Sequence, residues 1–277
     1  MDTIIQALIM GIVQGFTEFL PVSSSGHLIL VPYLFGWDDP FITSLAFSVM
    51  LHIGTLVALL TYFKGDWLRL IPAGLATIRD RSFREDPDRK LAWALVAATI
   101  PAAIVGFLFS DFFETQIRQP GLVAVTMVVG GLILWIADRF GAQSRTVDDV
   151  TLPVATGIGI AQALALIPGI SRSGISISAG RFAGLDRAAA ARFAFLMATP
   201  ITAGAIVFEA RKLLTGEAGV EVAVVPLLVG LVASLISGFA AIHFMLRYLR
   251  TRSLQVFVWY RFALVAIVLV VLLMRGV

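Results

Sequence analysis

The sequence predicts an all-α integral membrane protein with six transmembrane helices, two re-entrant helix–loop–helix hairpins and an inverted-topology internal repeat. Three observations support this fold class. First, 58% of the 277 residues are hydrophobic and only 14% are charged, whereas a soluble domain carries about 25% charged residues. Second, apolar runs of bilayer-spanning length recur along the chain. Third, two apolar segments are interrupted by polar residues and resemble each other. We therefore expect one membrane domain over residues 1–277.

Six apolar segments have the length of a spanning helix. They cover about residues 43–63, 89–109, 118–137, 187–208, 222–245 and 257–274. Segments 3–35 and 151–184 are also apolar, but Pro, Gly, Ser and charged residues break them in the middle. Irregular backbone is tolerated at membrane depth only inside protein or beside a water-filled cavity. We therefore expect both segments to enter the membrane and turn back as hairpins.

The two broken segments align when the sequence is shifted by 148 residues. The shift places Gly11-Ile12-Val13-Gln14 on Gly159-Ile160-Ala161-Gln162, Ser23 on Ser171, Ser25 on Ser173, and Gly26 on Gly174. Each half, 1–137 and 151–274, then contains one hairpin followed by three spans. Because three is an odd number, the second half enters the membrane from the opposite face. Such inverted repeats place functional sites near the bilayer midplane.

Basic residues gather on one side of this topology. That side holds Lys64, Arg69, Arg79, Arg81, Arg84, Arg139, Arg145, Arg247, Arg250 and Arg252. The other side holds Arg118, Arg211, Lys212 and Arg275. The positive-inside rule makes the first side cytoplasmic, so the termini and the mouth of the first hairpin face outward. Residues 64–88, which mix both signs of charge, are expected to form a solvated connector.

Two classes of site are excluded by composition. The chain has no cysteine, which excludes disulfides and thiolate metal sites. The net charge is +3, but the sequence contains no soluble domain that could carry a basic patch. We therefore expect no nucleic acid partner. Membrane lipids are the expected surroundings.

The first broken segment concentrates polar side chains that are rare in hydrocarbon. Gln14 and Glu18 are four residues apart and share one helix face. Ser24 and His27 are three apart and share a face if the chain is helical again after Pro21. Serines at such a helix start can cap it, and a helix N-terminus suits phosphate.

The second broken segment supplies a cation. In PGISRSGIS, residues 168–176, Arg172 stands among hydroxyls and glycines. An arginine at the membrane centre costs about 2.5–3.5 kcal/mol on insertion scales, and its planar fork fits phosphate oxygens. Together the segments suit phosphoryl transfer, in which a hydroxyl attacks, His27 exchanges a proton and Arg172 stabilises charge. Glu18, with Gln14, has the hard oxygen ligands that a divalent cation prefers.

Other interpretations of these residues stay open. Glu18 and Arg172 could form a purely structural ion pair, and serine clusters often serve close helix packing. His52 is a candidate cavity residue, and His243 is expected at an interface. Arg261, in the stretch FVWYR (257–261), is either a second phosphate contact or a side chain that reaches the interface.

The two motifs QGFTEFLPVSSSGHL (14–28) and PGISRSGIS (168–176) resemble the signatures of undecaprenyl-diphosphate phosphatases. These are bacterial inner-membrane enzymes associated with bacitracin resistance, and the resemblance spans essentially the full chain. It implies hydrolysis of undecaprenyl diphosphate to the monophosphate on the periplasmic or extracellular side, which recycles the lipid carrier for peptidoglycan and other envelope polymers. It also implies a requirement for Mg²⁺ or Ca²⁺.

The resemblance assigns roles to particular residues. The family's residues carry over onto Glu18, Ser24, His27, Ser171, Arg172 and Ser173. Catalytic roles are expected for Glu18, Ser24, His27 and Arg172, and the oxygen chemistry noted above makes Glu18 and Gln14 the expected metal ligands. The expected phosphate-binding residues are Ser23, Ser25, Ser171, Ser173, Gly174 and Ser176. Gln14 stands where many members carry glutamate, and Ser176 where threonine is common.

Several alternatives remain at this point. The nucleophile is Ser24, with His27 as its base, or His27 itself, or a water. A transporter or flippase for a lipid phosphate or another anion is the competing function, since broken helices in inverted repeats are typical of transporters. A homodimer stays open as the oligomeric state.

Overall fold

The computed structural model describes residues 2–83, 86–109, 112–113, 117–141, 144–215, 217 and 219–276. Over these residues the regular structure is helical, apart from one isolated bridge between Arg145 and Leu185. Six of the helices are long and apolar enough to cross a membrane. The prediction of an all-α protein with six such helices is therefore confirmed. Arg84, counted above among the basic residues, lies outside the described residues.

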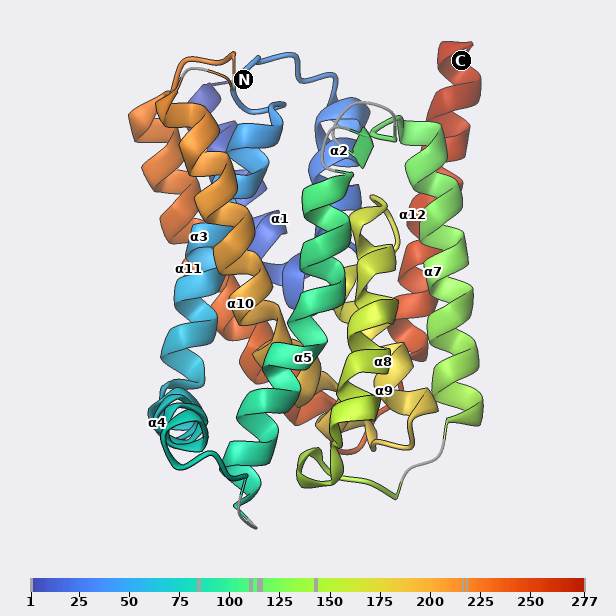
Figure 1. Ribbon diagram of the computed structural model, residues 1–277. Helices are drawn as coiled ribbons and strands as arrows, with labels where there is room; N and C mark the ends of the chain where they lie inside the picture. The colour runs from blue at the N-terminus through green and yellow to red at the C-terminus, as the bar shows by residue number, and fades with distance from the viewer. Residues whose placement is uncertain are drawn as a thin grey trace.

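The six long helices run along a common axis, and both termini lie at the same end of the bundle (Figure 1). They are α3 (Leu45–Tyr62), α5 (Pro87–Leu108), α7 (Pro120–Phe140), α10 (Arg187–Leu214), α11 (Val224–Tyr248) and α12 (Gln255–Arg275). Side chains mark several starts: Ser44, Asp86 and Asp186 each accept a backbone N–H from the first turn. These caps satisfy donors that a helix cannot pair internally.

Two pairs of shorter helices occupy the broken segments. The first pair is α1 (Thr3–Phe19) and α2 (Ser24–Phe35), and the second is α8 (Leu152–Ala163) and α9 (Arg172–Phe182). A 3₁₀ turn, η2 (Leu164–Leu166), follows α8, and another, η1 (Val147–Asp149), precedes it. In Figure 1, α1 runs down from the end that holds the termini and α2 returns, whereas α8 runs up from the opposite end and α9 returns.

Glycines allow α1 and α8 to approach their neighbours closely. α1 packs along α11, and α8 packs along α5. A Cβ added at Gly11 would lie 2.9 Å from the Cα of Gly230, and one added at Gly159 would lie 2.8 Å from the Cα of Ala98. Because neither position has room for a side chain, both close contacts depend on glycine, as is typical of helix packing in membranes.

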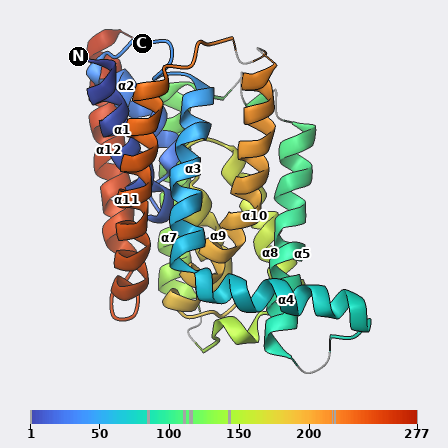
Figure 2. The same cartoon turned by 90° about the vertical axis from the view of Figure 1, so that its left-hand side faces the viewer.

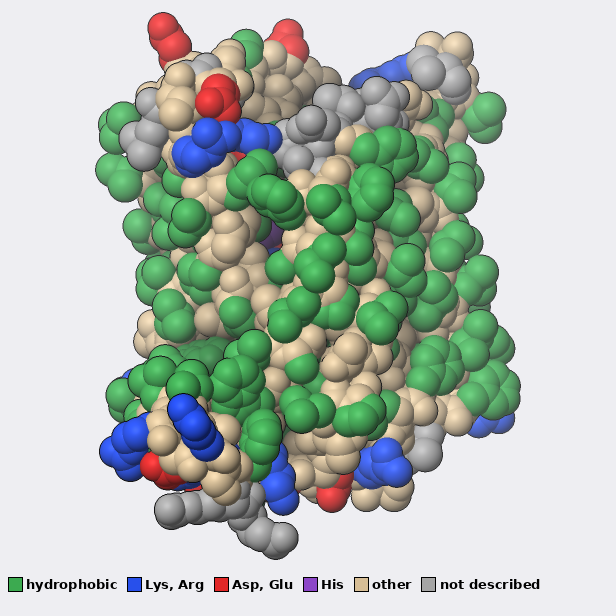
Figure 3. All heavy atoms as spheres, viewed as in Figure 1, with side chains coloured by type: hydrophobic (Ala, Val, Ile, Leu, Met, Phe, Trp, Pro, Cys, Tyr) green, Lys and Arg blue, Asp and Glu red, His purple; other side chains and the backbone are tan. Residues whose placement is uncertain are grey.

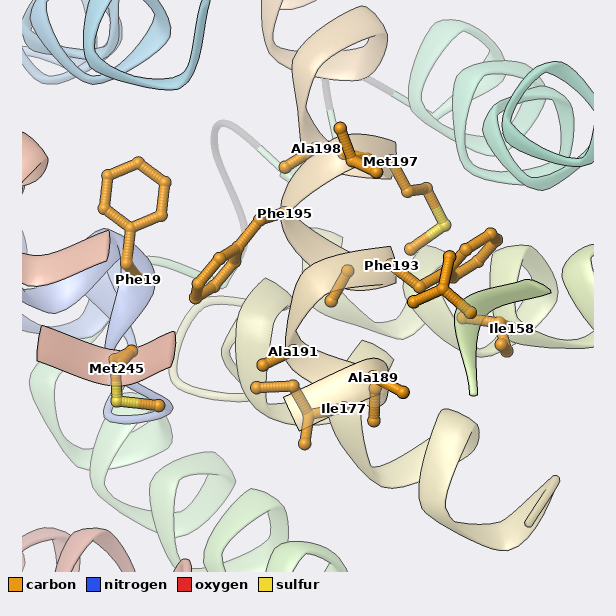
Figure 4. Close-up of a cluster of buried hydrophobic side chains, with 14 of the residues drawn as sticks. Phe19, Ile158, Ile177, Ala189, Ala191, Phe193, Phe195, Met197, Ala198 and Met245 are labelled. Atoms are coloured by element: carbon orange, nitrogen blue, oxygen red, sulfur yellow. The ribbon is translucent and has the colours of Figure 1, made fainter. Parts of the chain in front are cut away.

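The largest apolar core cluster forms around α10. Phe193, Phe195 and Met197 of α10 are buried and meet Phe19 of α1 and Ile158 of α8 (Figure 4). Phe19 and Phe195 contact edge to face, with ring centroids 5.3 Å apart. This cluster joins the first broken helix to the second half of the chain and so helps to set where α1 ends.

The outer surface is apolar over the height of the bundle, and Lys and Arg side chains gather at the end away from the termini (Figure 3). Exposed apolar residues such as Val232 of α11 and Leu273 of α12, which are 56% and 80% exposed, form part of this apolar surface. A belt of this kind is expected where lipid replaces water.

The segment expected to form a solvated connector, 64–88, is helical over most of its length. Residues Lys64–Asp80 form α4, which lies across the end of the bundle (Figure 2). Leu68, Ile71, Leu75 and Ile78 recur at helical spacing and are between 56% and 76% exposed. This stripe makes α4 amphipathic, and the mixed charges of the segment obscured the helical period.

Candidate active site

Both broken helix pairs bend at a serine with an unusual backbone. Ser23 has φ 77° and Ser171 has φ 80°, a region that non-glycine residues occupy at a cost of about 1–3 kcal/mol. Each is the N-cap of the following helix: the Ser23 Oγ accepts from the Gly26 N–H at 3.2 Å, and the Ser171 Oγ from the Gly174 N–H at 3.1 Å. The capping expected after Pro21 therefore falls on Ser23.

A single arginine links the two bends. Arg261 of α12 is fully buried, and its Nε donates to the Pro21 carbonyl at 2.7 Å. Both terminal nitrogens donate to the Ile170 carbonyl at 3.2 Å. Neither role expected for Arg261 is what the structure shows, because its guanidinium satisfies backbone carbonyls left without helical partners.

Glu18 stands at the centre of a cluster of donors near the end of α1. Its side chain is 4% exposed. Its Oε2 accepts from Ser24 Oγ at 2.7 Å and from Gln14 Nε2 at 3.0 Å, and the His52 Nε2 lies 3.3 Å from it. Its Oε1 accepts from the Arg172 guanidinium. Residues from α1, α2, α3 and α9 thus converge on one carboxylate.

The pairing of Glu18 with Arg172 brings the two broken segments into direct contact. Arg172 also donates from its second terminal nitrogen to Thr202 Oγ1 of α10 at 2.7 Å. Thr202 has no distinguishing pattern in the sequence, because it is a threonine inside a long apolar helix. The guanidinium is oriented by two partners, which is the preorganisation that binding of an oxyanion benefits from.

His27 points away from this cluster. Its Nδ1 lies 2.7 Å from the Ser23 carbonyl and its Nε2 lies 2.7 Å from the Tyr260 hydroxyl. The two rings stack at 5.6 Å. Because both ring nitrogens are engaged, the expected Ser24–His27 pair is not formed, and Ser24 bonds to Glu18 instead. Tyr260 lies in the FVWYR stretch, and it was not predicted as a site residue because aromatic residues near the end of a spanning helix are ordinary interface anchors.

Among the expected phosphate-binding residues, Ser25 faces a cavity together with Ser24, Ser176 lies inside α9, and the others lie at the bends. Ser23 and Ser171 are the caps described above. Ser173 Oγ donates to the Leu20 carbonyl at 3.1 Å and so joins the second bend to the first. A Cβ at Gly174 would lie 2.7 Å from an Arg261 nitrogen, so this glycine makes room for the arginine. Ser176 is 1% exposed.

The cavity has a volume of about 570 Å³. Its polar end is lined by Ser24, Ser25, His52, Arg172 and Thr202. Its remaining wall is mostly apolar and includes Leu45, Val49, Phe107, Leu166, Ile201 and Phe208. In Figure 3 a hollow between α10 and α5 leads inward to a histidine side chain. A charged head and an apolar tail would both find matching walls here.

The expected metal ligands Glu18 and Gln14 are adjacent. The Gln14 Oε1 is buried and has no hydrogen-bond partner among the described residues, so one hard oxygen next to the carboxylate remains free. Over the same residues, no group of three or more His, Cys, Asp and Glu gathers to hold an ion. Glu18 and Gln14 by themselves are fewer oxygen ligands than a divalent cation takes.

Comparisons with known proteins agree with the motifs. Residues 7–267 match the family model described as bacitracin resistance protein BacA. The chain is 45% identical over 271 residues to an undecaprenyl-diphosphatase of Desulforudis audaxviator, covering 98% of each chain. It is 44% identical over 273 residues to an undecaprenyl-diphosphatase of Moorella thermoacetica, covering 99% of each. Another, of Gemmatimonas aurantiaca, is 45% identical over 273 residues.

Proposed function

Because the chain belongs to the bacitracin resistance protein BacA family, we propose that it hydrolyses undecaprenyl diphosphate to undecaprenyl phosphate and inorganic phosphate. Relatives that share 44–45% of its residues over nearly their full length carry the name undecaprenyl-diphosphatase. The observation on which the proposal rests is the contact of Ser24 and Arg172 with the same buried carboxylate at the polar end of a mostly apolar cavity of about 570 Å³.

The reaction we propose starts at Ser24. Its Oγ attacks the terminal phosphorus while its proton passes to Glu18 Oε2, 2.7 Å away. The new bond joins the serine oxygen to phosphorus, and the anhydride P–O bond breaks to release undecaprenyl phosphate. Glu18 passes its proton to the departing undecaprenyl phosphate. A water then attacks the phosphoserine while Glu18 takes one of its protons; the bond between the serine oxygen and phosphorus breaks, and that proton passes to Ser24 Oγ, which releases phosphate and restores the serine. Water as the direct nucleophile is the alternative, with Glu18 as its base.

Arg172 binds the phosphate oxygens in this scheme. A guanidinium donates two parallel hydrogen bonds to a phosphate, and its contact with Thr202 keeps it facing the cavity. His27, with its ring against Tyr260, acts on the bend rather than on the serine proton. Such a role would be structural support for the start of α2.

A divalent cation, Mg²⁺ or Ca²⁺, fits this site only together with the substrate. We propose that Glu18 and the unpaired Gln14 Oε1 hold it with diphosphate oxygens, in the manner usual for Mg²⁺. When bound, the ion neutralises charge on the diphosphate.

The broken helix pairs are re-entrant hairpins of an inverted repeat in this proposal, which divides the chain into halves 1–137 and 151–274. Three observations support it: α1 and α8 run in opposite directions (Figure 1), α1 packs on α11 as α8 packs on α5, and Ser23 and Ser171 share one backbone conformation. The cavity extends toward Arg118 and Glu209, near the end that holds the termini. Since most basic residues lie at the other end, the site opens to the periplasmic or extracellular side of the bacterial inner membrane.

The experiment measures phosphate release from undecaprenyl diphosphate by purified protein, with and without Mg²⁺ or Ca²⁺. Ser24→Ala should abolish release, and the matched variant Ser253→Ala, at a serine that does not line the cavity, should keep most of it. Trapping of ³²P on the wild type but not on Ser24→Ala would identify the phosphoserine. A folded wild type without release under any of these conditions would overturn the enzyme and favour a transporter of lipid phosphate.

A further inference from the structure

His52 lies where it can hold the catalytic carboxylate. It is on α3, and its side chain is 20% exposed in the wall of the cavity. Its Nδ1 is 2.9 Å from the Ser48 carbonyl, and its Nε2 is 3.3 Å from Glu18 Oε2. The ring therefore spans the gap between the backbone of α3 and the carboxylate of α1.

The chemistry of these two contacts determines where the hydrogens are. A backbone carbonyl only accepts, so Nδ1 carries a hydrogen and donates to Ser48. A bare Nε2 would then direct its lone pair at a carboxylate oxygen, which is repulsive. The 3.3 Å contact between Nε2 and Oε2 is favourable when Nε2 also carries a hydrogen, which makes the ring cationic and lets it donate to Glu18.

The hydrogen bonds donated to Glu18 do not all persist during the proposed reaction. Arg172 holds Oε1, but the diphosphate competes for the same guanidinium. Ser24 gives up its hydrogen bond to Oε2 when it becomes the nucleophile. Gln14 and His52 are the two that remain, and they lie on different helices, α1 and α3.

We propose that His52 is a positioning residue for the reaction: its Nε2 hydrogen bond keeps Glu18 Oε2 directed at Ser24 while Arg172 engages the substrate. This inference rests on the proposed function. It assigns His52 and His27 different tasks, because His27 is bonded to Ser23 and Tyr260 at the bend. A carboxylate oxygen that moves away from the serine hydroxyl accepts its proton less readily. Misplacement of about 1 Å can cost on the order of 10²-fold in rate.

The test compares two substitutions at one position. Glutamine can donate an N–H from nearly the place of Nε2, whereas leucine fills the space without a donor. We expect His52→Leu to lower kcat by about 10- to 100-fold with KM within about threefold, and His52→Gln to keep kcat within about threefold of the wild type. His243→Leu is the matched control, since His243 contacts Tyr62 at the end of α3 and does not line the cavity.

The outcomes separate the two proposals. An active wild type with an unchanged His52→Leu would overturn the positioning role alone. Equal loss in His52→Gln and His52→Leu, with unchanged thermal stability, would overturn it too, because the donor would then be irrelevant. A wild type that releases no phosphate would overturn the enzyme itself, and the inference about His52 with it.

Discussion

The α1–α2 pair and the α8–α9 pair have the same backbone conformation at their bends but carry different side chains at corresponding positions. Shifted by 148 residues, Glu18 corresponds to Leu166, Ser24 to Arg172 and His27 to Ile175. The bends themselves match, with Ser23 and Ser171 at φ 77° and 80°. In the proposed reaction, the first pair supplies the serine and the carboxylate and the second supplies the arginine, so neither pair would form the site without the other.

The largest effect is expected from the contact between the two bends. Glu18→Gln and Arg172→Gln should each lower kcat by on the order of 10²- to 10³-fold. The first removes the proposed proton acceptor, and the second removes the guanidinium proposed to donate hydrogen bonds to the phosphate. The double variant should fall little further, since both act in one network. Initial rates of phosphate release measure this, and fully multiplicative losses would mean that the two bends work independently.

Arg261 tests what holds the two bends together. Arg261→Met should lower stability by about 3 kcal/mol or more, because the Pro21 and Ile170 carbonyls would be left buried without donors. Arg261→Lys should recover part of this loss, since one ammonium cannot reach all of the carbonyls. Thermal unfolding in detergent is the measurement. Arg275→Met is the control, since Arg275 donates to the exposed carbonyl of Tyr33. An equal loss of stability in that variant would contradict the proposed role of Arg261 in holding the two bends together.

A smaller pair of effects tests whether the halves are built alike. Gly11→Ala and Gly159→Ala should each destabilise by about 1–3 kcal/mol, because each added methyl overlaps a neighbouring backbone. Gly157→Ala is a control on the same helix as Gly159, since a Cβ at Gly157 meets no atom within 4 Å. A destabilisation by only one of the two alanines would show that the two close helix contacts do not contribute equally to stability.

The smallest effect concerns the outer end of the first pair. Burial raises the pKa of Asp39, but N–H donors of Ile42 and Phe41 and the Thr3 hydroxyl outweigh it, so the pKa lies below its ordinary value of 3.8. A lowered folded-state pKa stabilises the fold above pH 3.8 and loses that stabilisation as the pH falls through the folded-state pKa. Asp39→Asn should therefore lower the unfolding temperature slightly at pH 7, and by progressively less as the pH falls below 3.8. A constant difference over that range would contradict this origin.

Much of the architecture follows from sequence because its signals are local. The six long helices follow from apolar length, and the breaks follow from Pro, Gly and Ser inside apolar segments. The candidate residues Glu18, Ser24 and Arg172 follow from the rarity of polar groups in hydrocarbon. The helical period of α4 was equally present in the spacing of Leu68, Ile71 and Leu75, but its charges concealed it.

The partners of each polar residue depended on the tertiary structure. Ser24 and His27 share a face of one helix by spacing, yet Ser24 turns to Glu18 and His27 to Tyr260, which is 233 residues away. Arg261 and His52 could not be assigned from their own neighbourhoods, because their bonds reach other helices. Sequence by itself determined which side chains had to be sheltered from lipid, since burying a polar group without a partner is costly. Only packing decided which partner each one found, because that depends on where distant helices meet.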